Sequence, residues 1–329
     1  MLTALLKPLA VTATLVFPLA AEAACAGRNL LLDRAPAYLA QLDARTDGVP
    51  FPRGRLFEVT RDGATSTVFG TMHLSDTEIA PIPDAVRARI AAAKTLLVEM
   101  TRDEQSAMMM GFVANPGLMI EPSGRRVSDM ATEAQMAELD AIMVSYQFPR
   151  VVYDRMQPWL LGLTLSLPAC LIGEDPDAIL DARLEALAHA KSVPVTALDR
   201  AEEFVDLLTA PTYDEQLTAV LASLPMAAHA EDHLATAAAL YRAGEIWKIW
   251  AFAELEAETL TDPGTIDPYL SFFEDILLTD RNRRWIDRML PALAEGGAVV
   301  AVGALHLPGE NGLLALLQAE GFEVRALSD

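Results

Sequence analysis

Short β-rich segments that alternate with helical stretches constrain the fold of this chain more than any other sequence feature. Branched and aromatic residues cluster in six short apolar runs, at residues 55–60, 65–70, 95–100, 193–198, 298–302 and 322–326. Arg61-Asp62-Gly63 separates the first two runs, and its Asp-Gly pair favours a hairpin turn. Strands that alternate with helices are typical of α/β folds. The pattern therefore predicts a mixed α/β domain.

Helical patterns fill most of the remaining chain. They cover residues 83–93, 128–147, 180–190, 312–320 and a long stretch from 201 to about 293. In the second of these, Met136, Leu139, Ile142 and Met143 share one face. We expect the long stretch to break at Pro211, at Pro225 and at an Asp262-Pro263-Gly264 turn. Strands therefore flank a large helical middle region, at about 201–293.

Residues 1–23 have the pattern of a secretory signal peptide. Lys7 precedes an apolar run at 9–19, and Ala21-Glu22-Ala23 supplies a small-residue cleavage site. The run is shorter than the ~20 residues that a membrane-spanning helix needs, although an uncleaved anchor is the alternative. Glu22 stands where a lipoprotein signal has an aliphatic residue, which argues against lipidation at Cys25. We predict a periplasmic or secreted protein without stable membrane insertion after cleavage.

After the leader we expect a helical lead-in at 24–49 and one domain at 50–329. Cys25 and Cys170 are the only cysteines. An oxidising compartment permits a disulfide between them, and two buried free thiols are the alternative. Neither cysteine has a metal-ligand spacing to another, which excludes a cysteine-rich zinc site.

The balance of charges excludes one class of partner. The chain has 25 Lys and Arg against 46 Asp and Glu, a net charge of −21. A surface this acidic repels phosphate backbones, so nucleic acid is not an expected partner. Hydrophobic residues make up 52% of the chain, enough to bury a large core. A peptide or small-molecule substrate is the expected partner, and the oligomeric state stays open.

Two of the five histidines occupy the same local pattern. Gly70-Thr71-Met72-His73-Leu74 and Gly303-Ala304-Leu305-His306-Leu307 each follow a β-rich segment directly. A glycine lets the chain turn sharply at the end of a strand, where ligands bind in open α/β sheets. A lone histidine of this kind could simply bond to a turn carbonyl, but the repeat favours a shared site. We therefore predict a duplicated strand-turn-His core sheet flanked by helices.

Carboxylates also follow two of the predicted strands. Glu99 ends an apolar strand, where a charge is costly to bury unless it is paired or binds a metal, and a solvated strand end is the alternative. Asp199 ends the next strand in the same way and is a weaker candidate. Imidazole and carboxylate groups that converge can bind metal ions or transfer protons.

The remaining histidines and the tryptophans support simpler interpretations. His229 and His233 stand four residues apart, but the zincin pattern needs Glu where Ala230 stands, so a solvated acidic helix face is expected. We expect His189 to be a charged group at a helix end. Trp247 and Trp250 have helical spacing, which predicts that they pack in a core or line a cleft.

Together these residues resemble the TraB/GumN family, which is related to the Tiki proteases and more distantly to erythromycin-esterase-like and ChaN-like proteins. The resemblance spans about residues 50–328. It depends on the His73 turn, Glu99, a helix at Asp181 that leads to 195–199, the Arg281-Asn282 pair and the segment 303–313. Where the family usually has Leu-Glu after its middle strand, this chain has Leu198-Asp199, which puts Asp199 in doubt as a ligand.

The resemblance implies metal-dependent hydrolysis of peptide or ester bonds. It assigns His73, His306 and Glu99 as metal ligands, with Asp199 as a further candidate, and Mn, Co and Zn all accept such ligands. Arg281 would stabilise the developing oxyanion beside Asn282, and in another division of roles Glu99 acts as general base. A non-catalytic protein that binds haem or another small ligand in the same cleft is the alternative from a different class.

Overall fold

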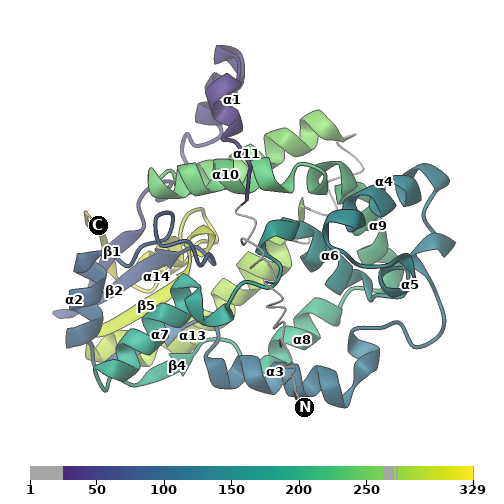
Figure 1. The fold of residues 1–329 in the computed structure, drawn as a ribbon. Coiled ribbons are helices and arrows are strands. Elements are labelled where there is room, and N and C mark those ends of the chain that lie inside the picture. The colour runs from purple at the N-terminus through teal and green to yellow at the C-terminus, as the bar shows by residue number, and fades with distance from the viewer. Residues whose placement is uncertain (1–24, 262–269, 272, 329) are drawn as a thin grey trace, which may run out of the picture.

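The computed structural model describes residues 25–261, 270–271 and 273–328 (Figure 1). The predicted signal peptide at 1–23 and the predicted turn at 262–264 lie outside the described residues. No helix among the described residues is long and apolar enough to cross a membrane.

The six predicted strands form a single mixed sheet. They are β1 (Leu56–Arg61), β2 (Ala64–Thr71), β3 (Thr95–Val98), β4 (Val195–Ala197), β5 (Ala298–Gly303) and β6 (Glu323–Ala326). Their order across the sheet is β4-β3-β5-β2-β1-β6. The first four strands in this order run parallel, while β1 is antiparallel to both β2 and β6. The structure thus confirms the mixed α/β class.

The predicted hairpin joins β1 to β2. Asp62 and Gly63 have φ angles of 53° and 80°, and Arg61 pairs with Ala64 on either side of them. A two-residue hairpin turn of this hand needs positive φ at both central positions, which Asp and Gly tolerate better than other residues. The Asp-Gly signal in the sequence was therefore sufficient to place this turn.

Helices cover both faces of the sheet. Phe69 and Val299 point to one face, where α2 (Asp84–Ala92) and α7 (Leu180–Ala190) pack on them. Val68 and Val300 point to the other face, against α13 (Asp280–Glu295) and α14 (Leu313–Ala319). Side chains of a strand alternate between the faces, so both neighbouring strands place apolar side chains on each face of the sheet.

A second group of helices lies beside the sheet (Figure 1). It has its own core, which includes Met136, Leu139 and Met143 from the predicted apolar face. Apart from α1 (Pro36–Ala44), the α-helices among the described residues that do not cover the sheet are α3 (Arg102–Ala114), α4 (Glu133–Ser145), α5 (Arg150–Tyr153), α6 (Pro158–Ser166), α8 (Ala201–Thr209), α9 (Tyr213–Ala227), α10 (Ala230–Arg242) and α11 (Ile246–Leu260). Short 3-10 turns are η1 (Leu30–Asp33), η2 (Pro116–Leu118), η3 (Val127–Asp129), η4 (Ala169–Leu171), η5 (Pro176–Ala178) and η7 (Ala304–His306), and η6 (Phe273–Thr279) is a π-helix.

One predicted helix break is wrong. Pro225 lies inside α9, which continues to Ala227. A proline removes one backbone hydrogen bond from a helix, because it has no N–H. Pro225 stands near the end of α9, where the helix tolerates this loss and continues to Ala227. The predicted break at Pro211 is confirmed, because α8 ends at Thr209 and Thr212 caps α9 through its hydroxyl.

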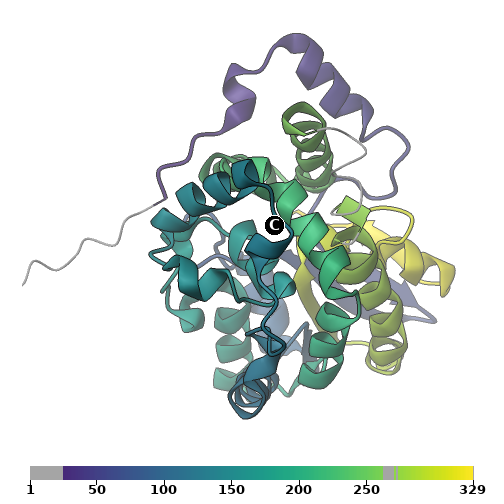
Figure 2. The same cartoon turned by 90° about the vertical axis from the view of Figure 1, so that its right-hand side faces the viewer.

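The N-terminal segment is fastened to the rest of the protein. Figure 2 shows it running over the top of the molecule, where α1 (Pro36–Ala44) lies near α11. Of the two alternatives for the cysteines, the disulfide is the one that forms: Cys25 is bonded to Cys170. Arg34 adds an ion pair to the buried Glu256 of α11. The lead-in is thus part of the folded domain.

Candidate functional site

Three of the predicted residues meet at one edge of the sheet. His73 follows β2, Glu99 follows β3 directly, and His306 lies in η7 after β5. These three strands are parallel neighbours, so they end at the same edge. The Nε2 atom of His73 lies 3.8 Å from Oε1 of Glu99, and Nε2 of His306 lies 3.7 Å from the same oxygen. We call these three side chains the strand-end site.

Close contacts surround both motif glycines. A Cβ on Gly70 would lie 2.9 Å from Cα of Ala304 in the other motif. A Cβ on Gly303 would lie 3.0 Å from Oε1 of Glu99 and 3.4 Å from Nε2 of His73. Neither glycine has a positive φ, so the reason for glycine here is space and not the sharp turn that the sequence suggested. The space in front of Gly303 lies among all three side chains of the strand-end site.

Asp181 orients the ring of His73. The Nδ1 atom of His73 donates to Oδ2 of Asp181 at 2.8 Å, and Thr71 donates its hydroxyl to the other carboxylate oxygen at 2.8 Å. The negative charge of Asp181 is the main reason that the pKa of His73 is raised to about 9. With Nδ1 held in this way, Nε2 is directed toward Glu99.

Asn282 orients the ring of His306. The Asn282 amide nitrogen donates to the carbonyl of Asn311 at 2.9 Å, so its oxygen is the acceptor for Nδ1 of His306 at 2.7 Å. The His306 ring packs on Trp285 with ring centres 4.4 Å apart. Burial lowers the pKa of His306 to about 3, so the imidazole is neutral and its Nε2 carries a lone pair.

Arg281 links the two carboxylates that follow the strands. Its Nη2 donates to Oε2 of Glu99 at 2.5 Å, and its Nε donates to Oδ2 of Asp199 at 2.9 Å. The other Glu99 oxygen accepts the backbone N–H of Gly303 at 2.6 Å. Burial alone would raise the pKa of Glu99, but the charges of Arg281 and His73 and the hydrogen bond from Gly303 outweigh it and lower the pKa. Glu99 is therefore ionised.

The structure places Asp199 apart from the imidazoles. Asp199 is 1% exposed, and its second oxygen accepts the indole N–H of Trp285 at 2.8 Å. Among the described residues, no group of three or more His, Cys, Asp or Glu is arranged to hold a metal ion as it stands. In this arrangement Nη1 of Arg281 lies 3.3 Å from Nε2 of His306 and acts as its donor.

Two contributors to the site were not predicted from the sequence as such. The role of Asp181 depends on a contact across 108 residues, and the sequence signal was only its place at the start of a helix. Trp285 stacks on His306 and binds Asp199, and no local pattern marked it. Both side chains contact a histidine of the strand-end site and fix its orientation.

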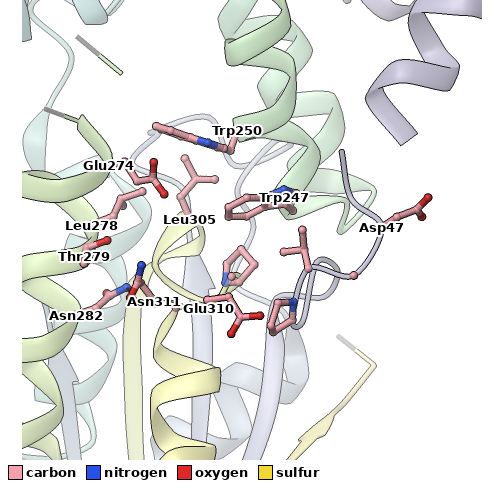
Figure 3. A pocket seen from close by; sticks show the side chains of 16 residues that line it. Asp47, Trp247, Trp250, Glu274, Leu278, Thr279, Asn282, Leu305, Glu310 and Asn311 are labelled. Carbon is pink, nitrogen blue, oxygen red and sulfur yellow. Dashed lines mark hydrogen bonds between the residues drawn. The ribbon is translucent and has the colours of Figure 1, made fainter. Parts of the chain in front are cut away.

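A cavity of about 320 Å³ adjoins the site on the Asn282 side of His306. Figure 3 shows the rings of Trp247 and Trp250 on its walls, with Leu305 between them and the carboxylate of Glu274 beside Trp250. The prediction that these tryptophans pack in a core or line a cleft is thus confirmed, because they line a cavity.

The interpretation of the remaining histidines needs one correction. His189 and His229 are exposed, but the side chain of His233 is only 17% exposed and its Nε2 lies 3.7 Å from Oε2 of Glu256. His233 also packs edge-on against Phe252. It is therefore part of the packing between α10 and α11 and not of a solvated face.

Comparison with known proteins gives a family match over the region that contains the strand-end site. The model described as TraB/PrgY/gumN family matches residues 55–326. The uncharacterized protein YbaP of Shigella flexneri is 27% identical over 258 residues, 77% of this chain and 88% of the relative. YbaP of Escherichia coli K12 is 27% identical over 256 residues, 76% of this chain and 87% of the relative. No solved structure matches the chain.

Proposed function

The chain belongs to the TraB/PrgY/gumN family, and from the geometry of its strand-end site we propose that it is a metal-dependent hydrolase of peptide or ester bonds. One observation carries the proposal. Two imidazole Nε2 atoms face the same oxygen of Glu99 within 3.8 Å, and each ring is held from behind through Nδ1 by a separate oxygen acceptor. Side chains fixed in this way are typical of metal and water-activating sites.

The donor set is chemically suited to a divalent ion. Two imidazoles and one carboxylate are three protein ligands, which leaves a position for water. Ligand atoms of a tetrahedral ion with ~2.1 Å bonds lie about 3.4 Å apart. The two distances of 3.7 and 3.8 Å from Oε1 of Glu99 need only a small contraction, and the side chain that Gly303 lacks leaves room among the ligands. His73, His306 and Glu99 would hold the ion, and Mn, Co and Zn all accept them.

Before His306 can bind an ion, its Nε2 atom must lose the hydrogen bond from Arg281. Nε2 of His306 now accepts from Nη1 of Arg281 at 3.3 Å. Arg281 keeps other acceptors when it releases this nitrogen, because it also donates to Asp199 and to the carbonyl of Leu277. A guanidinium already held against Glu99 and His306 indicates that this spot favours positive charge.

Each side chain has a role in hydrolysis. A bound divalent ion supplies a water of lowered pKa. Glu99 is ionised, as a carboxylate that holds a divalent ion must be; in the alternative division of roles it would leave the ion to the histidines and act as general base. Arg281 is positioned to stabilise negative charge that develops on a carbonyl oxygen. His73 is the exposed member of the site, so substrate approaches from its side.

We also propose that the protein is exported. The sequence begins with the pattern of a signal peptide, and the Cys25–Cys170 disulfide is the kind of bond that persists in oxidising compartments.

A cleavage assay tests the proposed function. Peptide and ester libraries are incubated with wild-type protein, His73→Ala, His306→Ala and the matched control His189→Ala, whose histidine is exposed on α7. We expect cleavage that chelators abolish, that both site variants lose, and that the control keeps. Cleavage equal in all four proteins, or none in any, would overturn the hydrolase. A haem absorption band that survives washing of a protein without activity would favour the binding alternative.

A further inference from the structure

We propose that the cavity beside His306 binds a basic side chain of the substrate, a lysine or an arginine, so that cleavage occurs next to basic residues. This inference rests on the proposed function, because it names the substrate class of the same site. We call this space the tryptophan cavity; its lining includes Trp247, Trp250, Glu274, Leu305 and Glu310.

The tryptophan cavity lies beside the strand-end site, with the side chain of Asn282 between them. The Asn282 side chain lines the cavity, and its oxygen is the acceptor for Nδ1 of His306. Leu305, the residue before His306, lies on the same wall. A substrate group in the cavity is therefore separated from the His306 ring by the side chain of Asn282.

The two indole rings are held in fixed orientations. The indole N–H of Trp247 donates to the carbonyl of Arg45 at 3.0 Å, and that of Trp250 donates to Glu254 at 2.9 Å. Gly309 permits the close approach of Trp247, because a Cβ there would lie 3.1 Å from the ring atom Cζ3. Ring faces held in this way attract cations through their electron-rich surface.

Every formal charge among the described residues of the lining is negative. Asp47, Glu274 and Glu310 line the cavity, and the described lining residues include no lysine or arginine. Figure 3 shows the Glu274 carboxylate beside the Trp250 ring, whereas Asp47 is directed away from both rings. Burial, together with the charges of Asp275 and Glu254, raises the pKa of Glu274.

Size and charge together select the occupant. A space of about 320 Å³ is at the lower end of ligand pockets, which suits one long side chain. An acidic substrate group would be repelled, both locally and by the net charge of −21. A neutral aliphatic side chain could use the rings but not the carboxylates. An ammonium or guanidinium group can use both.

A binding experiment tests whether the charge or the shape of the substrate side chain determines its affinity for the cavity. Nα-acetyl-lysine methylamide, its neutral analogue Nα-acetyl-norleucine methylamide, which lacks the ammonium group, and Nα-acetyl-glutamate methylamide are titrated by calorimetry and tryptophan fluorescence. We expect the lysine compound to bind at least about fivefold more tightly than the norleucine compound, and the glutamate compound not to bind. Equal binding of lysine and norleucine compounds would overturn the proposal.

Two variants assign the discrimination to the cavity. Glu274→Gln keeps the shape and removes one charge, so it should reduce the preference for lysine about fivefold. Asp62→Asn removes one charge in the exposed β1–β2 turn and should leave the preference unchanged. Equal effects of the two variants would attribute the preference to net charge alone and overturn the cavity as its source.

The outcomes distinguish this inference from the proposed function. Binding of lysine that depends on Glu274, in a protein that cleaves nothing, would support the cavity and contradict the hydrolase. Cleavage that depends on His73 and His306 but not on basic residues beside the cleaved bond would support the hydrolase and contradict the proposed role of the cavity.

Discussion

The substitution Gly303→Ala tests the space at the centre of the strand-end site. The new Cβ would lie 3.0 Å from Oε1 of Glu99, 3.4 Å from Nε2 of His73 and 3.5 Å from Cδ2 of His306. Non-bonded carbon contacts become favourable only near ~3.5 Å, so the methyl group would displace Glu99 and fill the space between the rings. Water and a metal ion need that space if the proposed function is correct.

The effect on stability should be small. Gly303 has a φ of −49°, so the backbone does not demand glycine. Alanine restricts the unfolded chain and gains about 0.4–1 kcal/mol, whereas rotating the Glu99 side chain away from the new methyl group costs about 0.5–1.5 kcal/mol. These terms nearly cancel. Chemical denaturation should therefore give a free energy of unfolding within about 1 kcal/mol of the wild type.

The effect on function should be large. The methyl group would occupy the space that the proposed water and metal ion need, so we expect a rate about 100-fold below wild type, which corresponds to about 2.7 kcal/mol of barrier. Rates on the best substrate of the library, and ion content after dialysis, give the two readouts. Gly111→Ala is the matched control, since a Cβ in that position on α3 meets nothing within 4 Å. Wild-type rate and ion content in Gly303→Ala would refute the assignment of this space to water and metal.

Three further predictions concern the N-terminal segment and the ring of His73. Reduction of Cys25–Cys170, which closes a loop of 145 residues, should lower the free energy of unfolding by about 2–4 kcal/mol, measured by denaturant titration with an unreduced control. Burial alone would raise the pKa of Glu256, but its hydrogen bonds and neighbouring charges lower it. Stability from Glu256 is therefore present above its ordinary pKa of 4.5 and lost as the pH falls below it, a loss that Glu256→Gln should diminish in acid unfolding curves. In metal-free protein, Asp181→Asn should lower the pKa of His73 from about 9 toward 6.5 in an NMR titration, and an unchanged pKa would contradict the role of Asp181.

The sequence was sufficient for the sheet because its signals are local. Asp62-Gly63 determines the hairpin, and the short apolar runs mark all six strands to within a few residues. Parallel strands end at one edge of a sheet, so placing His73 and His306 after such strands predicted that they lie near each other. Their Nε2 atoms do face the same oxygen of Glu99.

The parts that the sequence could not supply depend on long-range contacts. Asp181 bonds to His73 across 108 residues, and Trp285 bonds to Asp199 across 86. The Arg281 guanidinium separates Asp199 from the imidazoles, although the ends of the strands look equivalent in the sequence. Strand register and the packing of helices determine these contacts, and patterns of neighbouring residues do not reveal either of them.

Titration of metal-free protein with Co²⁺ tests the central claim most directly. Nitrogen ligation of Co²⁺ gives visible absorption bands whose growth reports the stoichiometry and the geometry of the site. We expect saturation at about one ion per chain in wild-type protein and in His189→Ala, with the bands lost in His306→Ala and in Glu99→Gln. Absence of the bands in wild-type protein, or bands that persist unchanged in both site variants, would contradict a metal centre formed by His73, Glu99 and His306.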